Sequence, residues 1–259
     1  MVTQAEPFET TPSPCSEPLD KLNLFGLMAE DVRTALERDP AARTAFEVAT
    51  TYAGVHALWG HRVSHWMWTH GMKWLARAFA QFARFLTGVE IHPGACIARR
   101  FFIDHGMGVV IGETAVIQED VTIYHNVTLG GVSLVKIKRH PTIEPGVVIG
   151  AGAKVLGDIT VGSHSRIGAN AVVIKSVPPQ SVVVGVPGQI IRRKQTDTGR
   201  KADLSHTDLP DAIVNALQGV IKRLDTVESR LDLHQSEQTD MHLEPDGIWE
   251  YVETGDYVI

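Results

Sequence analysis

Hydrophobic residues in the middle of the chain recur at every sixth position. A period of six fits neither an α-helix, with about 3.6 residues per turn, nor a single strand, with a period of about two. It indicates a solenoid of stacked coils, in which each short strand repeats one inward apolar position. The register is unbroken within each of two runs, Ile91, Ile97, Ile103, Val109, Ala115, Val121 and Val127, and then Ile143, Ile149, Val155, Val161, Ile167 and Val173.

The break between these runs reads VTLGGVSLVKIKRHPT, with two glycines followed by a polar end. We expect this segment to form a loop that projects from the solenoid. Three hexapeptides make one triangular coil, and the pattern ends near VPPQSVVVGVPG. The predicted β-helix domain therefore spans residues 89–191.

A helical pattern precedes the solenoid. Over residues 21–88, glycine and proline are sparse, and apolar residues recur at three- and four-residue spacing. Asp39-Pro40 predicts a helix start within this segment, because proline fits the first helical position after an Asp cap. The predicted fold class is α+β, with an N-terminal α-helical domain followed by the β-helix.

The chain beyond the solenoid is more polar. Residues 192–208 indicate a linker, and residues 235–259 a flexible acidic tail, as residues 1–20 do at the other end. Between them, residues 209–234 predict a helix with a heptad seam, formed by Ile213, Leu217, Val220, Leu224, Val227 and Leu231. Two interpretations stay open, an amphipathic helix packed on the solenoid or a short coiled coil.

Composition narrows the function classes. A net charge of -6 argues against a nucleic-acid partner. The most apolar helical stretch, WLARAFAQFARFL, is interrupted by charged residues, so we expect no membrane span. The N-terminus lacks the apolar core of a signal peptide, and the two cysteines suggest no disulfide framework. These features predict a cytoplasmic protein.

Several polar residues interrupt the apolar pattern where a stacking coil does not need them. Asp104 and His105 adjoin each other in FFIDHGMGVVIG, and Arg139 and His140 end the projecting loop that follows Gly131. A neutral imidazole can take a proton from a hydroxyl group that attacks a thioester. A glycine N–H can stabilise the developing oxyanion. Arginine binds a carboxylate and aspartate an ammonium group, so we hypothesise acyl transfer to a hydroxy amino acid.

The motifs RDPAA, EIHPGA, IDHGMGVVIGETAVI, VTLGG, KRHPTI, IGAGAKVLG and GVPG together resemble those of the serine O-acetyltransferase family, over roughly residues 24–193. The resemblance implies that the β-helix is left-handed and that the chain assembles as a homotrimer or a dimer of trimers. It also implies acetyl transfer from acetyl-CoA to the hydroxyl of L-serine in a ternary complex, without an acyl-enzyme or a further cofactor. The loop residues 132–138 depart from the glycine-rich segment that many members have there.

The resemblance also assigns roles to single residues. It implies that His105 is the general base, that Glu90 orients it, and that His140 takes part in catalysis and serine binding. It places the remaining substrate residues at Asp39, Asp104 and Arg139 for serine, and at Gly131, Ala151 and Arg166 for acetyl-CoA.

The C-terminal residues DYVI are similar to the ends of some family members, in which the terminal isoleucine enters O-acetylserine sulfhydrylase (cysteine synthase). The resemblance therefore implies that Tyr257, Val258 and Ile259 bind this partner enzyme. A free carboxylate after an aliphatic residue suits such capture. The alternative is an ordinary tail without a partner.

Other functions stay open from the residues alone. One methylene in the acceptor contributes only about 1–3 kcal/mol of discrimination, so homoserine or another hydroxyl acceptor is an alternative. A zinc β-helix of the carbonic-anhydrase type would need three histidines that meet across a trimer interface. An inactive scaffold that only regulates a partner is a third alternative. His61 and His65 have helical spacing but no third ligand nearby, so we expect no metal site there.

Overall fold

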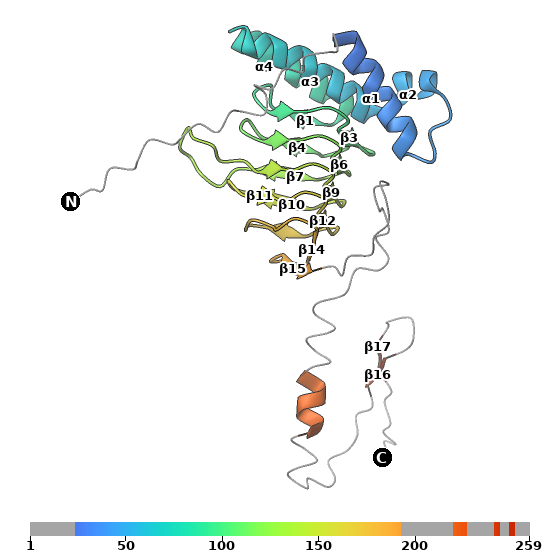
Figure 1. Cartoon of the computed structure of the whole chain (residues 1–259), viewed down its shortest axis with the longest axis vertical. Helices are drawn as coiled ribbons and strands as arrows, with labels where there is room; N and C mark the ends of the chain where they lie inside the picture. Colours follow the sequence, from blue (N-terminus) through green and yellow to red (C-terminus); the bar gives the residue numbers. More distant parts are fainter. Residues whose placement is uncertain (1–23, 193–219, 227–240, 244–248, 252–259) are drawn as a thin grey trace, which may run out of the picture. The chain divides into compact units, whose positions relative to one another are not determined.

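The computed structural model describes residues 24–192, 220–226, 241–243 and 249–251. The chain divides into two units, Met1–Pro210 and Asp211–Ile259. Within residues 24–192, the first unit contains four helices followed by a stack of short strands (Figure 1). The helices are α1 (Leu24–Arg38), α2 (Ala45–Thr51), α3 (Ala53–Thr69) and α4 (Lys73–Thr87).

The strands form three sheets, which are the three faces of a triangular solenoid. Face A contains β1 (Glu90–Ile91), β4 (Val110–Ile111), β7 (Thr128–Gly130), β10 (Lys154–Leu156) and β13 (Val172–Val173). Face B contains β2 (Cys96–Ile97), β5 (Val116–Ile117), β8 (Thr142–Ile143) and β11 (Thr160–Val161). Face C contains β3 (Phe102–Ile103), β6 (Thr122–Ile123), β9 (Val148–Ile149), β12 (Arg166–Ile167), β14 (Ser181–Val184) and β15 (Gln189–Arg192). All pairings within these faces are parallel except that of β14 with β15, so the predicted parallel β-helix is confirmed.

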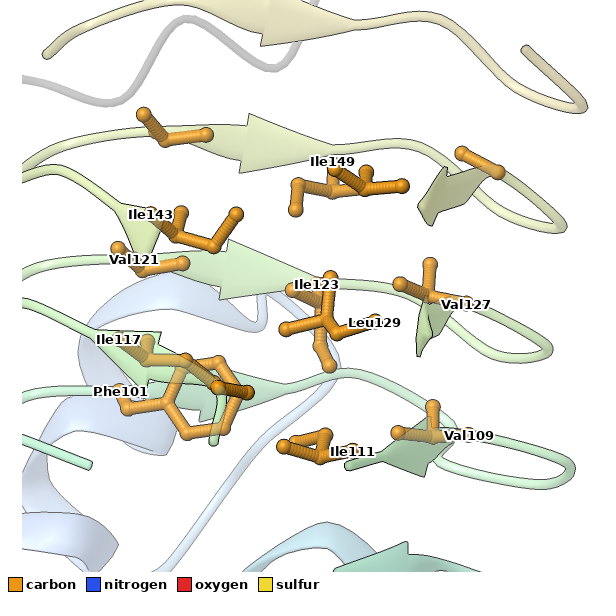
Figure 2. Close-up of a cluster of buried hydrophobic side chains, with 14 of the residues drawn as sticks. Phe101, Val109, Ile111, Ile117, Val121, Ile123, Val127, Leu129, Ile143 and Ile149 are labelled. Atoms are coloured by element: carbon orange, nitrogen blue, oxygen red, sulfur yellow. The ribbon is translucent and has the colours of Figure 1, made fainter. Parts of the chain in front are cut away.

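Aliphatic side chains fill the interior of the coils. Ile111, Ile117 and Ile123 succeed one another on the three faces, and each is almost fully buried (Figure 2). Burial of one such side chain stabilises the fold by about 1.5–3 kcal/mol. Every strand from β1 to β14 directs an apolar residue into this interior. The polar residues of the candidate site therefore lie at the corners between the faces.

The six-residue register is not continuous in the first run, contrary to our expectation. Ile91 pairs with Ile111, twenty positions on, whereas Ile111 pairs with Leu129, eighteen positions on. The two extra residues lie at the corner after Ile103. Beyond this corner, the residues of the expected series from Val109 to Val127 are no longer the inward residues of the strands. Each lies two residues before the inward strand residue, as Val109 does before Ile111, and points inward at a second position. Both positions are buried, so hydrophobicity alone could not separate them.

The helices pack against the first coils of the solenoid. Arg62 in α3 forms a bidentate, buried ion pair with Asp31 in α1. A Cβ at Gly54 would lie 2.2 Å from the carbonyl oxygen of Ile103, so glycine is required where α3 crosses β3. The predicted helix start after Asp39-Pro40 is wrong. Asp39 lies in a turn instead, and α2 begins at Ala45 after Thr44, whose hydroxyl accepts the N–H of Glu47.

The loop between β7 and β8 projects from the stack as expected (Figure 1). Four of its apolar side chains are exposed: Val132, Leu134, Val135 and Ile137. The chain re-enters the solenoid at His140. Arg139 and His140 therefore lie where the loop ends, and not at its exposed tip.

The second unit is described only in part. Residues 220–226 are helical, within the helix expected over 209–234, and Val220 and Leu224 of the heptad seam are exposed there. An antiparallel pair, β16 (Met241–Leu243) with β17 (Trp249–Tyr251), lies in the segment that we expected to be a flexible tail. The other four residues of the seam, on which its two interpretations depend, lie outside the described residues. The linker from residue 193 onward, the terminal residues 257–259 and the expected tail over residues 1–20 lie outside them as well. In the described ranges, no helix is long and apolar enough to span a membrane.

Candidate active site

The corner between faces C and A carries His105 and Asp104 directly after β3. His105 has a positive φ of 59°, and its carbonyl accepts the N–H of Met107, which closes the turn. Its side chain is 72% exposed, and Nε2 lies 3.9 Å from Oδ1 of Asp104. The ring of His125 stands edge-on to it from the next coil, with 5.8 Å between ring centroids. An accessible imidazole beside a carboxylate is the arrangement that a general base needs.

Asp39 brings a second carboxylate to this corner. Its Oδ2 accepts the hydroxyl of Tyr52 at 2.6 Å, which raises the pKa of Tyr52 to about 12. Burial raises the pKa of Asp104, and the charge of Asp39 raises it further, whereas His105 lowers it. Two neighbouring carboxylates repel each other and attract a cation. We call Asp39, Asp104 and His105 the carboxylate cluster.

Arg38 holds Asp39 against the solenoid. Its guanidinium donates to the carbonyl of Val121 and to the hydroxyl of Thr122, and it pairs with the carboxylate of Asp120 at 2.8 Å. These contacts fix the end of α1 on the second coil. The residue after α1 therefore lies next to a corner formed 65 positions later in the chain.

The corner between faces A and B carries a second group, the arginine cluster: Glu113, Thr114, Arg139 and His140. Nη2 of Arg139 lies 2.5 Å from Oε2 of Glu113, and this arginine holds the pKa of Glu113 below its usual value. His140 is only 8% exposed and is bound to Thr114 through its Nδ1. A Cβ at Gly112 would lie 2.0 Å from Nε2 of His140, and one at Gly131 would lie 3.1 Å from it. Glycine at both positions leaves room for this ring.

Nothing in the sequence assigned a role to Glu113 or Thr114, although both belong to the GETA motif. Their partners lie 25 and 26 positions away, across the projecting loop. A pattern of local spacing cannot reveal such contacts.

The remaining candidates lie at several places. The Glu90 carboxylate pairs with Arg84 at 3.2 Å, and within the described ranges no hydrogen bond or ion pair joins it to His105. Ala151 lies at the same corner as His105, two coils farther along the solenoid, and accepts the N–H of Asn170. Arg166, in β12 on face C, is close enough to Tyr124 to lower its pKa against the effect of burial. Within the described residues, the predicted site residues thus gather in two places, the carboxylate cluster and the arginine cluster.

His92, of EIHPGA, adjoins the arginine cluster in a packed environment. Its Nδ1 accepts the N–H of Gly94 at 2.9 Å, and its ring lies edge-on to Trp68 at 5.0 Å. Burial is the main cause that lowers the pKa of His92 to about 4, and the charge of Arg77 lowers it as well. His61 is fully buried in α3, so its pKa is also well below the ordinary value. Both rings are neutral in the folded protein at pH 7.

We expect these two histidines to make the fold sensitive to acid. Between pH 6.5 and pH 4 the unfolded chain protonates both rings while the folded chain does not, so the free energy of unfolding falls as the pH falls. Urea unfolding at fixed protein concentration measures this. In His92→Asn, whose amide oxygen can still accept the N–H of Gly94, the decline should be shallower. The same exchange at exposed His164 is the control, and an unchanged slope in His92→Asn would contradict the prediction.

No group of three or more His, Cys, Asp or Glu residues in the described ranges could hold a metal ion. His61 and His65 pack ring against ring, with centroids 5.4 Å apart.

A stack of hexapeptide coils with an exposed histidine beside a carboxylate at one corner is typical of hexapeptide-repeat transferases. The model of the family "Bacterial transferase hexapeptide (six repeats)" matches residues 140–175. The serine acetyltransferase of Mycobacterium tuberculosis is 58% identical over 200 residues, which are 77% of this chain and 87% of that protein. The chain belongs to the serine acetyltransferase family.

Solved structures agree with this assignment. A serine acetyltransferase from Brucella abortus in complex with coenzyme A is 41% identical, with a TM-score of 0.63 over 65% of this chain and 68% of that one. A serine acetyltransferase from Neisseria gonorrhoeae in complex with serine is 39% identical, with a TM-score of 0.63 over 65% of this chain and 69% of that one.

Proposed function

We propose that this protein transfers the acetyl group of acetyl-CoA to the hydroxyl of L-serine, which yields O-acetylserine and CoA. Family membership supports the reaction, and the relatives that bind coenzyme A and serine support the substrates. The observation that carries the proposal is the carboxylate cluster. It combines an accessible imidazole with a paired negative site for the serine ammonium group.

His105 is the general base in this proposal. It takes the proton of the serine hydroxyl while the oxygen attacks the thioester carbonyl. The tetrahedral intermediate then collapses, the C–S bond breaks, and the proton passes from His105 to the departing thiolate of CoA. The backbone N–H of Gly131 would stabilise the oxyanion. Because the hydroxyl attacks directly, no acyl-enzyme is formed.

Asp39 and Asp104 bind the serine ammonium group, and Arg139 binds its carboxylate. In the free protein Glu113 partly neutralises Arg139 and fixes its orientation. Homoserine would place its hydroxyl one methylene farther from its charged end. The fixed distance between Arg139 and the base then favours serine, although by only about 1–3 kcal/mol.

The two clusters lie at opposite edges of face A, so one copy of the chain separates the base from Arg139 and His140. In a closed ring of three copies, one edge of each subunit meets the other edge of its neighbour. We therefore propose a homotrimer whose sites each combine the carboxylate cluster of one subunit with the arginine cluster of the next. Trimers could pair further into a hexamer.

Subunit mixing tests this arrangement. Trimers of His105→Ala alone, or of His140→Ala alone, should be nearly inactive. We coexpress the two variants with different tags and isolate trimers that carry both. Any mixed ring of three contains one junction at which both side chains are intact, so about one third of the wild-type activity should return.

Light scattering establishes the assembly, and mixtures of each variant with itself are the controls. Mixed trimers that remain as inactive as the single variants would contradict a site shared between subunits. An active wild-type monomer would contradict it as well.

In the same proposal, Ala151 and Arg166 contact acetyl-CoA, and Glu90 orients His105. We also propose that the protein is cytoplasmic and that the terminal residues 257–259 bind cysteine synthase.

A further inference from the structure

The hydroxyl of Thr114 contacts three groups of the Arg139–His140 segment. Its Oγ1 accepts the backbone N–H of Arg139 at 3.0 Å and that of His140 at 3.1 Å. The same oxygen lies 2.8 Å from Nδ1 of the His140 ring. A hydroxyl that accepts two hydrogen bonds still has its own proton to donate, and Nδ1 is the neighbour that can accept it.

A second donor points at the same ring nitrogen. The backbone N–H of Thr114 donates to Nδ1 of His140 at 3.2 Å. An N–H can donate only to a nitrogen that has no proton, so the proton of the neutral ring must be on Nε2. Burial is the main cause that lowers the pKa of His140.

The charged and titratable groups around this ring act in both directions. The positive charges of Arg139 and Lys138 lower the pKa of His140 further, whereas the carboxylate of Glu113 raises it. His92, which directly follows β1, lies near enough for the charge of a protonated His140 to lower the pKa of His92. The ring is therefore neutral at pH 7.

We propose that Thr114 is a positioning residue that fixes His140 in the tautomer with a protonated Nε2, so that this ring donates a hydrogen bond to the bound substrates. This rests on the proposed function, which places His140 in the acetyl transfer site. Nε2 lies against Gly112 and Gly131, where added Cβ atoms would come within 2.0 and 3.1 Å. The donor thus lies beside the proposed amide donor of Gly131. His140 in this state cannot be a second base through Nδ1, so proton removal is left to His105.

The test uses Thr114→Val, which keeps the shape but lacks the hydroxyl, and Thr114→Ser, which keeps the hydroxyl. Thr160→Val is a matched control, because Thr160 is a similarly half-buried threonine of the solenoid. We expect Thr114→Val to lower kcat about 10- to 100-fold, with a smaller change in KM for acetyl-CoA, since a misplaced group costs mainly turnover. Thr114→Ser should restore kcat to within about threefold of wild type.

The pH profile separates tautomer control from a structural role. Without the hydroxyl, one of the two donors that keep a proton off Nδ1 is lost, so His140 protonates more readily. The acid limb of kcat in Thr114→Val should therefore move to higher pH, and Thr114→Ser should reverse the shift.

The tautomer itself can be measured by ¹⁵N NMR of the full-length protein with labelled histidine, with the His140 signals assigned by their loss in His140→Gln. We expect a protonated Nε2 and an unprotonated Nδ1. A proton on Nδ1 in wild type, or wild-type kcat and pH profile in Thr114→Val, would overturn the proposal. Equal losses in Thr114→Val and Thr160→Val would do the same, because they indicate a general effect on folding. The expected tautomer with full activity in His140→Gln would instead remove His140 from the proposed function.

Discussion

Replacing His105 by asparagine is expected to lower kcat by about 10²–10⁴-fold, the usual contribution of a general base. Asparagine is the sharper choice, because His105 has a positive φ and asparagine tolerates this conformation better than alanine does. The loss then reports the missing imidazole and not a strained corner. The measurement is release of the CoA thiol from acetyl-CoA at saturating serine.

His105→Ala should be at least as inactive as His105→Asn. Light scattering and the melting temperature of both variants establish that the assembly is intact. The neighbouring His125, whose ring faces His105, provides a matched control as His125→Asn, which removes an imidazole from the same corner. Near-normal acetylation of serine by His105→Asn would exclude His105 as the base.

The second large effect is expected from Gly112→Ala. A methyl group at this position would lie 2.0 Å from Nε2 of His140, so the ring must move away. Gly112 has no positive φ, so the alanine itself fits the backbone. A displacement of about 1 Å can cost about 10²-fold in rate, and we expect a loss of that order in kcat.

A double-mutant cycle shows whether the effect passes through His140. If the added methyl acts only by displacing this ring, Gly112→Ala combined with His140→Ala should be no less active than His140→Ala alone. Fully additive losses would mean that Gly112→Ala damages the site in another way. Unchanged kcat in the single variant would show that His140 contributes little to turnover.

The sequence by itself determined the solenoid. Each strand of a coil buries one inward apolar residue, so the six-residue pattern depends only on nearby residues and repeats with every strand. The projecting loop was equally predictable, because it interrupts that pattern. The types of chemistry were visible too, since Asp104, His105, Arg139 and His140 are polar residues in places where the fold does not need them.

The helical segment was predictable as helical, but not in its details. Asp39 has the sequence signature of a helix cap, yet it lies in a turn between α1 and α2. Arg38, the last residue of α1, binds Asp120 and Thr122 on the solenoid. Tertiary contacts such as these can override a local preference for a helix start.

Only the tertiary structure decided how the site residues are grouped. The corner that a residue occupies depends on the count of all residues in the preceding coils, and the two extra residues after Ile103 change that count without changing hydrophobicity. The count places His105 between faces C and A and His140 between faces A and B. Thr114 reaches His140 only because one coil stacks on the next across 26 positions of chain. The projecting loop lies between these two residues in the sequence, and its length follows no repeat. No local sequence pattern therefore predicts that Thr114 and His140 are in contact.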